Sequence, residues 1–257
     1  MDESLLETQK TWIPLEANPE VLTTFMQSLG VAKEWEFCDI YGIDQELLDM
    51  VQKPIAAVIL LFPITDAYEQ NRYKLEDEIT EKGQILSDKV YFMRQYIGNA
   101  CGTIGVIHSV LNNSDVISFE PNGFFSKFLA TTTTLNGEER AISLMKNSDI
   151  EKSHEIAAVQ GQSTVPNEDE PVILHFVSFV HVDGHLYELD GRKPFPINHG
   201  ESSQETILED TAEVLRKMIE VNPDEIRFTL MGLVKKSEEE EEEEEEKEKE
   251  KEGAKTN

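Results

Sequence analysis

The sequence predicts a mixed α/β domain over residues 1–236, followed by a charged tail over 237–257. Three observations indicate this fold class. An unbroken apolar run at 54–64 has the length of a buried strand and is too short to cross a membrane. The dipeptide at 183–184, Asp-Gly, lies between strand-like runs and is the strongest short-range signal for a β-hairpin. Between these strand signals, the middle of the chain has helical patterns.

The N-terminal part of the chain alternates helices and strands. Asn18, Pro19 and Glu20 supply an N-cap, a proline at the first helical position and an early acid, which predict a helix over 19–29 that ends at Gly30. The patterns that follow predict a strand at 36–41, a short helix from Asp44, a strand at 55–62 and a charged surface helix at 67–82.

The rest of the chain is helical at first and then returns to strands. We expect helices near 101–111, 122–130, 137–147 and 150–159, strands at 172–182 and 185–190, a helix near 204–221 and a last strand near 225–234. Residues 161–171 carry turn-forming and acidic residues without hydrophobic periodicity, so we expect a mobile loop there.

The chain is strongly acidic, with a formal net charge of -28. Residues 238–257 contain twelve Glu and four Lys, which contribute -8 and leave -20 on residues 1–237. Such a surface repels nucleic acid and anionic membranes and attracts basic partners. We expect the tail to be disordered and to serve as a solubilising extension, with an interaction tail as the alternative.

The N-terminus and the cysteine content indicate the compartment. The first four residues include two acids, whereas secretory signals and transit peptides are basic there. The two cysteines, Cys38 and Cys101, cannot form a disulfide scaffold for a domain of this size, which favours a reducing compartment. We therefore expect a soluble protein of the cytoplasm, with the nucleus as a further location, in which a cysteine serves either packing or chemistry.

Cys101 lies where the start of a helix activates a thiol. It follows Asn99, a good N-cap, and precedes Gly102, which lets a substrate backbone approach, so we place the thiol in the first helical turn. The helix N-terminus favours the thiolate and leaves backbone N–H groups that bind an oxyanion. The alternative is a buried structural cysteine, which is the better interpretation of a single cysteine taken alone.

Hairpin geometry supplies a base for this thiol. With a two-residue turn at 183–184, Val177 faces Asp190, and His175 lies on the same strand face as Val177. His175 and Asp190 are then diagonal neighbours, as the base and the orienting carboxylate of a Cys/His/Asp arrangement must be. The alternative is a core histidine beside a turn aspartate.

The other histidines fit the role of base less well. His108 lies on the same helical face as Cys101 but about 10 Å along the axis, so we assign it to the core. The rest are His181 and His185 beside the turn, and His154 and His199 in segments that look exposed. None has the spacing of a zinc ligand, so no metal site is predicted.

Four stretches together carry a family pattern: 14–20 (PLEANPE), 60–65 (LLFPIT), 99–103 (NACGT) and 182–200 (VDGHLYELDGRKPFPINHG). In this order they resemble the ubiquitin carboxyl-terminal hydrolases, most closely the small single-domain animal members. The resemblance extends from Trp12 to about Leu233. It implies a papain-like cysteine hydrolase fold of the α/β class, with a central, mostly antiparallel sheet flanked by helices and a knotted backbone.

The resemblance also assigns roles at the site. It implies Cys101 as the nucleophile, His175 as the general base, Asp190 as the group that orients His175, and Gln95 as an oxyanion donor beside the Cys101 backbone N–H. A loop near 155–171 corresponds to the crossover loop of the family, which limits the size of the leaving group. The chemistry needs no cofactor.

The resemblance further implies contacts with the basic C-terminal tail of ubiquitin, made by Leu15, Glu16, Glu20, Asp39 and Glu225. For each acid the alternative is a solvated surface charge. We expect a monomer that cleaves amide, thioester or ester adducts of ubiquitin, or of a close ubiquitin-like protein, and prefers small leaving groups. The alternative functions are a ubiquitin-binding or ubiquitin-stabilising protein with little turnover, and an acidic interaction protein that depends on the tail.

Overall fold

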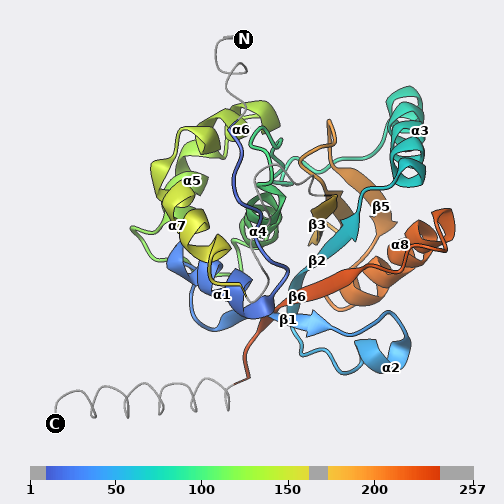
Figure 1. The fold of residues 1–257 in the computed structure, drawn as a ribbon, viewed down its shortest axis with the longest axis horizontal. Helices are drawn as coiled ribbons and strands as arrows, with labels where there is room; N and C mark the ends of the chain where they lie inside the picture. The colour runs from blue at the N-terminus through green and yellow to red at the C-terminus, as the bar shows by residue number, and fades with distance from the viewer. Residues whose placement is uncertain (1–9, 162–172, 238–257) are drawn as a thin grey trace.

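A single antiparallel sheet forms the centre of the computed structural model, which describes residues 10–161 and 173–237 (Figure 1). Six strands lie in the order β1-β6-β2-β3-β4-β5, and each neighbouring pair runs antiparallel. Helices α1 and α4–α7 cover one face of this sheet, and α2, α3 and α8 lie on the other side (Figure 1). The predicted α/β class with a flanked antiparallel sheet is confirmed, and the backbone knot stays a prediction.

The elements lie close to their predicted positions. In chain order they are α1 Pro19–Ser28, β1 Trp35–Ile40, α2 Gln45–Leu48, β2 Ile55–Pro63, α3 Asp66–Lys82, α4 Cys101–Leu111, α5 Phe124–Thr132, α6 Gly137–Met145, α7 Ser148–Ala158, β3 Leu174–Val182, β4 His185–Leu189, β5 Ile197–Glu201, α8 Ile207–Val221 and β6 Thr229–Lys235. Strand β5 was not predicted, because its sequence, Ile-Asn-His-Gly-Glu, has neither an apolar run nor a clear alternation.

Local signals explain the best-predicted elements. The Asn18 side chain accepts hydrogen bonds from the backbone N–H groups of Glu20 and Val21, at 2.9 and 3.3 Å, and so caps α1. In the hairpin, Asp183 and Gly184 both have positive φ angles, 48° and 80°, as a type I′ turn requires.

The predicted crossover loop overlaps the end of a helix. The first four residues of the expected crossover loop, 155–158, belong to helix α7, because Ala157 and Ala158 continue its buried face. The rest of that loop, from residue 162, lies outside the described residues, as does the tail from residue 238.

The core has two parts, one on each face of the sheet. Strand β2 is buried along its whole length and feeds both, since Ile59 and Leu61 point to the side of α1 and α4, whereas Leu60 and Phe62 point to the side of α8. Helix α4 is buried at every residue and is surrounded by packed side chains. Its first residue is therefore held rigidly. No helix in the part of the chain that the structure describes is long and apolar enough to cross a membrane.

Candidate active site

Three elements bring Cys101, His175 and Asp190 together. Cys101 is the first residue of α4, His175 is the second residue of β3, and Asp190 directly follows β4. Strand β3 pairs with β4 in the predicted register, with Ser178 opposite Leu189. The diagonal placement of His175 and Asp190 is therefore confirmed, and α4 brings the thiol to the same end of the sheet.

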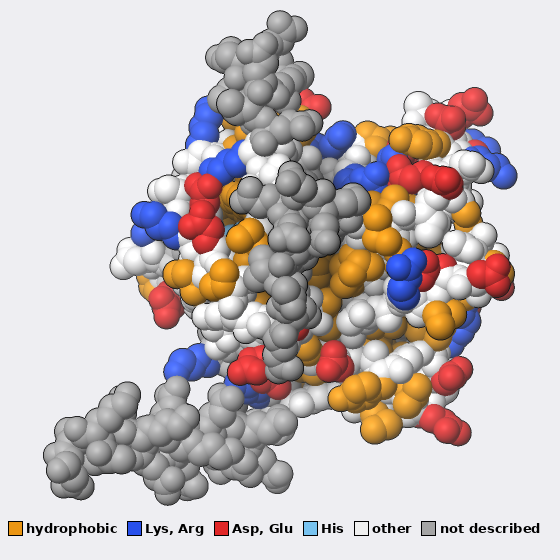
Figure 2. Space-filling view, in the orientation of Figure 1, with side chains coloured by type: hydrophobic (Ala, Val, Ile, Leu, Met, Phe, Trp, Pro, Cys, Tyr) orange, Lys and Arg blue, Asp and Glu red, His pale blue; other side chains and the backbone are white. Residues whose placement is uncertain are grey.

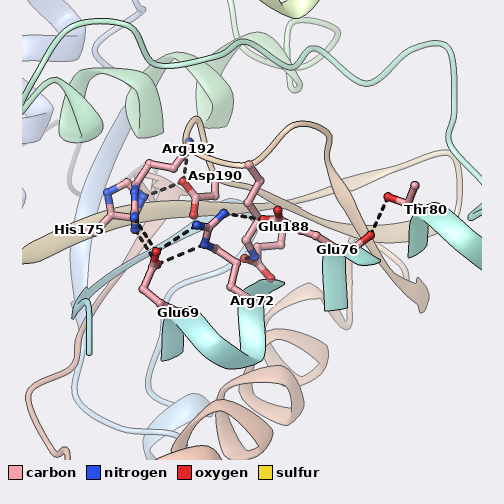
Figure 3. Close-up of polar contacts among 9 residues, drawn as sticks. Glu69, Arg72, Glu76, Thr80, His175, Glu188, Asp190 and Arg192 are labelled. Carbon is pink, nitrogen blue, oxygen red and sulfur yellow. Dashed lines mark hydrogen bonds and ion pairs between the residues drawn. The ribbon is translucent and has the colours of Figure 1, made fainter. Parts of the chain in front are cut away.

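His175 lies between the other two side chains. Its Nε2 atom is 2.7 Å from Asp190 Oδ1 (Figure 3), which leaves Nδ1 for the hydrogen bond with the Cys101 thiol. All three residues are buried, with exposed fractions of 6 % for Cys101, 3 % for His175 and 0 % for Asp190. A thiol, an imidazole and a carboxylate in this spatial order form a catalytic triad, in which the imidazole activates the sulfur as a nucleophile.

Charges within this group shift each pKa toward the ionised form. Burial alone raises the pKa of the Cys101 thiol, but the hydrogen bond and charge of His175 outweigh it and lower that pKa below its ordinary value. Burial likewise disfavours imidazolium, yet Asp190 and Cys101 raise the pKa of His175 to about 9. The imidazolium in turn holds the pKa of Asp190 well below its usual range. The site therefore favours a thiolate–imidazolium pair.

A network from α3 holds the loop that follows Asp190. The backbone N–H of Arg192 donates to Asp190 Oδ1 at 2.9 Å, and the Arg192 guanidinium binds both oxygens of Glu69 at 3.1 and 3.0 Å (Figure 3). Arg72 also binds Glu69 and reaches Glu76 at 2.7 Å. This network was not predicted from the sequence. Only the helical spacing of Glu69, Arg72 and Glu76 could have indicated its α3 half.

A second buried group of charges lies beside Asp190. Lys193 binds Glu188, and the other oxygen of Glu188 is 2.8 Å from His199 Nε2. Burial raises the pKa of Glu188, but Lys193 and His199 lower it to about 2 overall. The expectation that His199 is exposed is thus wrong, because β5 turns its ring toward the carboxylate in the sheet.

Gln95 is placed beside the loop after Asp190. Its backbone N–H donates to the Gly191 carbonyl at 2.8 Å, and its side-chain Nε2 donates to the Ile97 carbonyl at 3.1 Å. One N–H of that amide remains for another acceptor. Its Oε1 is buried and accepts no hydrogen bond from the residues that the structure describes.

The residues around the thiol differ from expectation in two ways. Ala100, not Asn99, is the N-cap of α4, and Asn99 has a left-handed φ of 59°, which asparagine tolerates better than most residues. The space beside Gly102 is occupied by the chain itself. A Cβ atom at this position would lie 3.1 Å from Leu15 Cβ and 3.3 Å from the ring of Phe176.

The predicted ubiquitin contacts lie on different parts of the surface. Leu15 is buried against α4. Glu16 is half-buried and lies two residues before Asn18, the N-cap of α1. Glu20 and Asp39 are exposed. Glu225 lies on the rim of an apolar pocket.

Glu225 already has a partner in the chain. Arg227 donates two side-chain hydrogen bonds to its carboxylate, at 2.8 and 2.5 Å, and lowers its pKa to about 2. The pocket beside it has a volume of about 250 Å³ and is lined by apolar side chains that include Ile226 and Phe228.

The remaining buried histidines have structural partners. His108 is in the core, as predicted, where its Nε2 accepts a hydrogen bond from Met93 N–H at 3.1 Å and burial lowers its pKa to about 4. His154 was expected to be exposed, and this is wrong, because α7 turns it inward against Trp12. Within residues 10–161 and 173–237, no cluster of three His, Cys, Asp or Glu side chains is arranged to hold a metal ion.

The fold and the site together define an α/β thiol hydrolase with a Cys/His/Asp triad. The chain belongs to the family described as ubiquitin carboxyl-terminal hydrolase, family 1, whose model matches residues 12–220. Among its relatives, a probable ubiquitin carboxyl-terminal hydrolase of Dictyostelium discoideum is 78% identical over 239 residues, which cover 93% of this chain and 94% of the relative. Ubiquitin carboxyl-terminal hydrolase isozyme L1 of Homo sapiens is 47% identical, over 86% of this chain and 97% of its own length.

A solved structure supports the fold independently. The UCH37 catalytic domain of Trichinella spiralis, bound to ubiquitin vinyl methyl ester, is similar with a TM-score of 0.69. The similarity covers 89% of this chain and 97% of that one at 23% sequence identity. At this identity the likeness concerns the fold.

Proposed function

We propose that this chain hydrolyses amide, thioester and ester bonds at the C-terminal glycine of ubiquitin. Its family is named for this reaction, and its relatives carry the same name. The observation that carries the proposal is the position of His175, which bridges Asp190 and the Cys101 thiol at the N-terminus of a buried helix. A binding protein would have no use for a thiol activated in this way.

The reaction proceeds through an acyl-enzyme. His175 Nδ1 holds the thiol proton, and the Cys101 thiolate attacks the glycine carbonyl carbon to form a C–S bond. The backbone N–H of Cys101 and the remaining N–H of Gln95 stabilise the oxyanion. His175 then protonates the leaving group as its bond to carbon breaks, and later takes a proton from the water that hydrolyses the thioester. Asp190 keeps the ring oriented throughout.

We further propose a preference for small leaving groups. The thiol is almost completely buried, and Leu15 and Phe176 fill the space beside Gly102. A scissile bond therefore reaches sulfur only at the end of a slender, extended chain. A folded leaving group must be held away from this narrow site, which costs binding energy at the reacting centre.

Ubiquitin, or a close ubiquitin-like protein, would dock on an acidic and partly apolar face. Figure 2 shows hydrophobic side chains gathered at the lower right, in the region of α2, with acidic side chains at their edge. Tyr41 and Ile226 line the pocket beside Glu225 and are exposed by 75 % and 84 %. We propose that Asp39 and Glu225 contact ubiquitin near this face, whereas Leu15, Glu16 and Glu20 contact it from the side of α1 and α4. The strongly negative charge of the chain favours a basic partner tail.

We place the protein in the cytoplasm, with the nucleus as a second location, as a monomer with a catalytic domain over 1–236 and a separate tail over 237–257. Cys38 and Cys101 form no disulfide with each other, and the reaction requires Cys101 to stay reduced. Deleting 237–257 should leave ubiquitin cleavage unchanged, and a large loss of cleavage would assign the tail to the enzyme.

The test of the function is covalent trapping followed by turnover. Ubiquitin vinyl methyl ester should form a thioether at Cys101 that peptide mass spectrometry locates. The protein should then release a fluorophore or a short peptide from the ubiquitin C-terminus much faster than it cleaves diubiquitin. No adduct under reducing conditions would refute the enzyme. An adduct without turnover would favour a ubiquitin-binding protein, and equal rates on diubiquitin would refute the leaving-group preference.

The pH profile of kcat/KM should reflect the ion pair. Because the pKa of Cys101 is lowered, the thiolate should form at lower pH than in an ordinary thiol. Because the pKa of His175 is raised to about 9, activity should fall as pH rises through about 9. The same ion pair should add to the free energy of unfolding. This contribution should be complete below about pH 6.5, the usual histidine pKa, and should be lost as pH rises through about 9. Iodoacetamide alkylation as a function of pH measures the thiolate directly. A profile like that of an ordinary thiol, with a midpoint near about 8.5, would contradict the ion pair.

Asp190→Asn should weaken the enzyme without abolishing turnover. His175 can still act as a base, but it loses the charge that raises its pKa and orients its ring. We expect kcat/KM to fall by roughly 10²-fold, within the range of general-base contributions, and the alkaline limb to move to lower pH. Steady-state kinetics across pH test this. Activity equal to that of the parent would mean that Asp190 serves only the turn.

A further inference from the structure

His154 is a buried titratable side chain that the triad does not use. It lies on α7 with an exposed fraction of 0 %. Both ring nitrogens have partners, since Nδ1 is 2.7 Å from Thr103 Oγ1 and Nε2 is 2.6 Å from the Ile13 carbonyl oxygen. The ring also packs on Trp12, with centroids 4.4 Å apart. A single imidazole thus joins α7, α4 and the segment that precedes α1.

The partners determine the state of the ring. The Ile13 carbonyl only accepts, so Nε2 carries the hydrogen and donates it. Nδ1 then accepts a hydrogen bond from the Thr103 hydroxyl. Burial lowers the pKa of His154 to about 4, and the neutral ring with both hydrogen bonds is therefore the form present at neutral pH. Thr103 is two residues after Cys101 and belongs to the same first turn of α4.

The segment over residues 10–15 lies beside the first turn of α4, where Leu15 packs against Gly102. Figure 1 shows it running beside α4 toward α1. At Gly98 it forms two backbone hydrogen bonds of 2.9 Å, one from Trp12 N–H to the Gly98 carbonyl and one from Gly98 N–H to the Lys10 carbonyl. Lys10 also forms an ion pair of 2.6 Å with Glu151 of α7.

The far end of the segment is held differently. After Trp12, the Ile13 carbonyl accepts the hydrogen bond from His154 Nε2. Two residues further on, Leu15 packs beside Gly102. A displacement of Ile13 moves Leu15 relative to the residue next to the nucleophile. The His154 bridge is therefore one of the contacts that hold Leu15 in place, beside its packing in the core.

We propose that His154 is a positioning residue that holds residues 10–15 against the first turn of α4. It thereby fixes Leu15 beside Gly102 and sets the width of the passage by which a substrate reaches the Cys101 thiol. The proposal rests on the proposed function, because the chain that passes there is the extended C-terminus of ubiquitin. A passage of the right width orients the glycine carbonyl toward the sulfur, and a loose one leaves the substrate bound but misaligned. Most ubiquitin contacts lie elsewhere, so His154 acts on kcat more than on KM.

Isosteric substitution at Thr103 provides the main test. Thr103→Val keeps the shape but removes the hydroxyl that binds His154, whereas Thr103→Ser keeps the hydroxyl. We expect Thr103→Val to lower kcat for release of a fluorophore from ubiquitin by roughly fivefold, the effect of losing one buried hydrogen bond, with KM changed by less than twofold. Thr103→Ser should restore most of kcat.

The histidine itself is tested by a graded pair. His154→Ala removes both bonds and should lower kcat further, whereas His154→Gln keeps an amide that reaches the Ile13 carbonyl and should recover part of it. Alkylation of Cys101 by iodoacetamide should stay within twofold in all four variants, because a small reagent does not need the passage. Turnover of the parent protein in the same assay separates a failure of the proposed function from a failure of this role.

A matched control removes a buried hydroxyl elsewhere on α4. The Ser109 hydroxyl donates to the Gly105 carbonyl and lies 2.8 Å from Ser178 Oγ. Ser109→Ala therefore removes a buried, hydrogen-bonded hydroxyl, as Thr103→Val does, but away from the passage. It should lower the Tm and leave kcat near that of the parent. Unchanged kcat in Thr103→Val and His154→Ala would overturn the proposal. So would a parallel loss of iodoacetamide reactivity, because it would place the effect in the triad.

Discussion

Cys101→Ala should abolish hydrolysis of ubiquitin adducts and leave ubiquitin binding in place. The thiolate is the group that forms the acyl-enzyme, and the water that remains in its place is a poor nucleophile without activation. We expect kcat to fall by about 10⁵-fold or more, as for the removal of a nucleophile in other hydrolases. Release of a fluorophore from ubiquitin measures the loss, and calorimetric titration with ubiquitin measures the Kd.

Cys38 provides the matched control for this prediction. Cys38→Ala removes the other cysteine thiol, on β1, and should keep full turnover and adduct formation. Turnover by Cys101→Ala, or its loss in Cys38→Ala, would place the nucleophile elsewhere. Loss of ubiquitin binding in Cys101→Ala would show that the substitution disturbs more than the chemistry.

His175→Gln should nearly abolish turnover as well, because the thiol loses both its base and the charge that lowers its pKa. A general base contributes up to about 10⁴-fold, and we expect a loss of this size in kcat/KM. Burial then raises the pKa of Cys101, so iodoacetamide alkylation at neutral pH should slow in parallel. This parallel loss distinguishes the triad from the passage beside Gly102, where alkylation is expected to persist.

The stability of His175→Gln gives an independent check. The substitution leaves the Asp190 carboxylate buried without the imidazolium that it faces, which costs about 3 kcal/mol at neutral pH. The double variant His175→Gln, Asp190→Asn removes the stranded charge and should recover part of this loss without recovering turnover. Urea unfolding of the single and double variants measures the difference. Equal stability of the parent and His175→Gln would contradict the buried ion pair.

The positions of the triad residues could be predicted because each depends on local rules. Asp183 and Gly184 demand a two-residue turn, and that turn fixes which residue of β4 faces which residue of β3. His175 and Asp190 are only 15 residues apart, so one hairpin register brings them together. The start of α4 at Cys101 was equally local, although the cap residue was wrong, because Asn99 is a turn former as well as a good cap and here takes the left-handed turn.

Long-range contacts account for what the sequence alone did not show. Arg192 and Glu69 are 123 residues apart, and His154 and Ile13 are 141 apart, so no periodicity within either segment reveals the pair. The polar face of α7 that made His154 look exposed gave no sign of the carbonyl and hydroxyl that satisfy its ring. A buried polar side chain is stable only when such partners are present, and distant elements supply them.

The sequence by itself determined the α/β class, the hairpin, the helix that begins at Cys101 and the family to which the chain belongs. Only the tertiary structure decided that Leu15 fills the space beside Gly102, that α3 holds the loop after Asp190, and that His154 ties three elements together. The physical reason is that turns and periodicities are properties of neighbouring residues, whereas burial and the pairing of charges depend on how the whole chain packs.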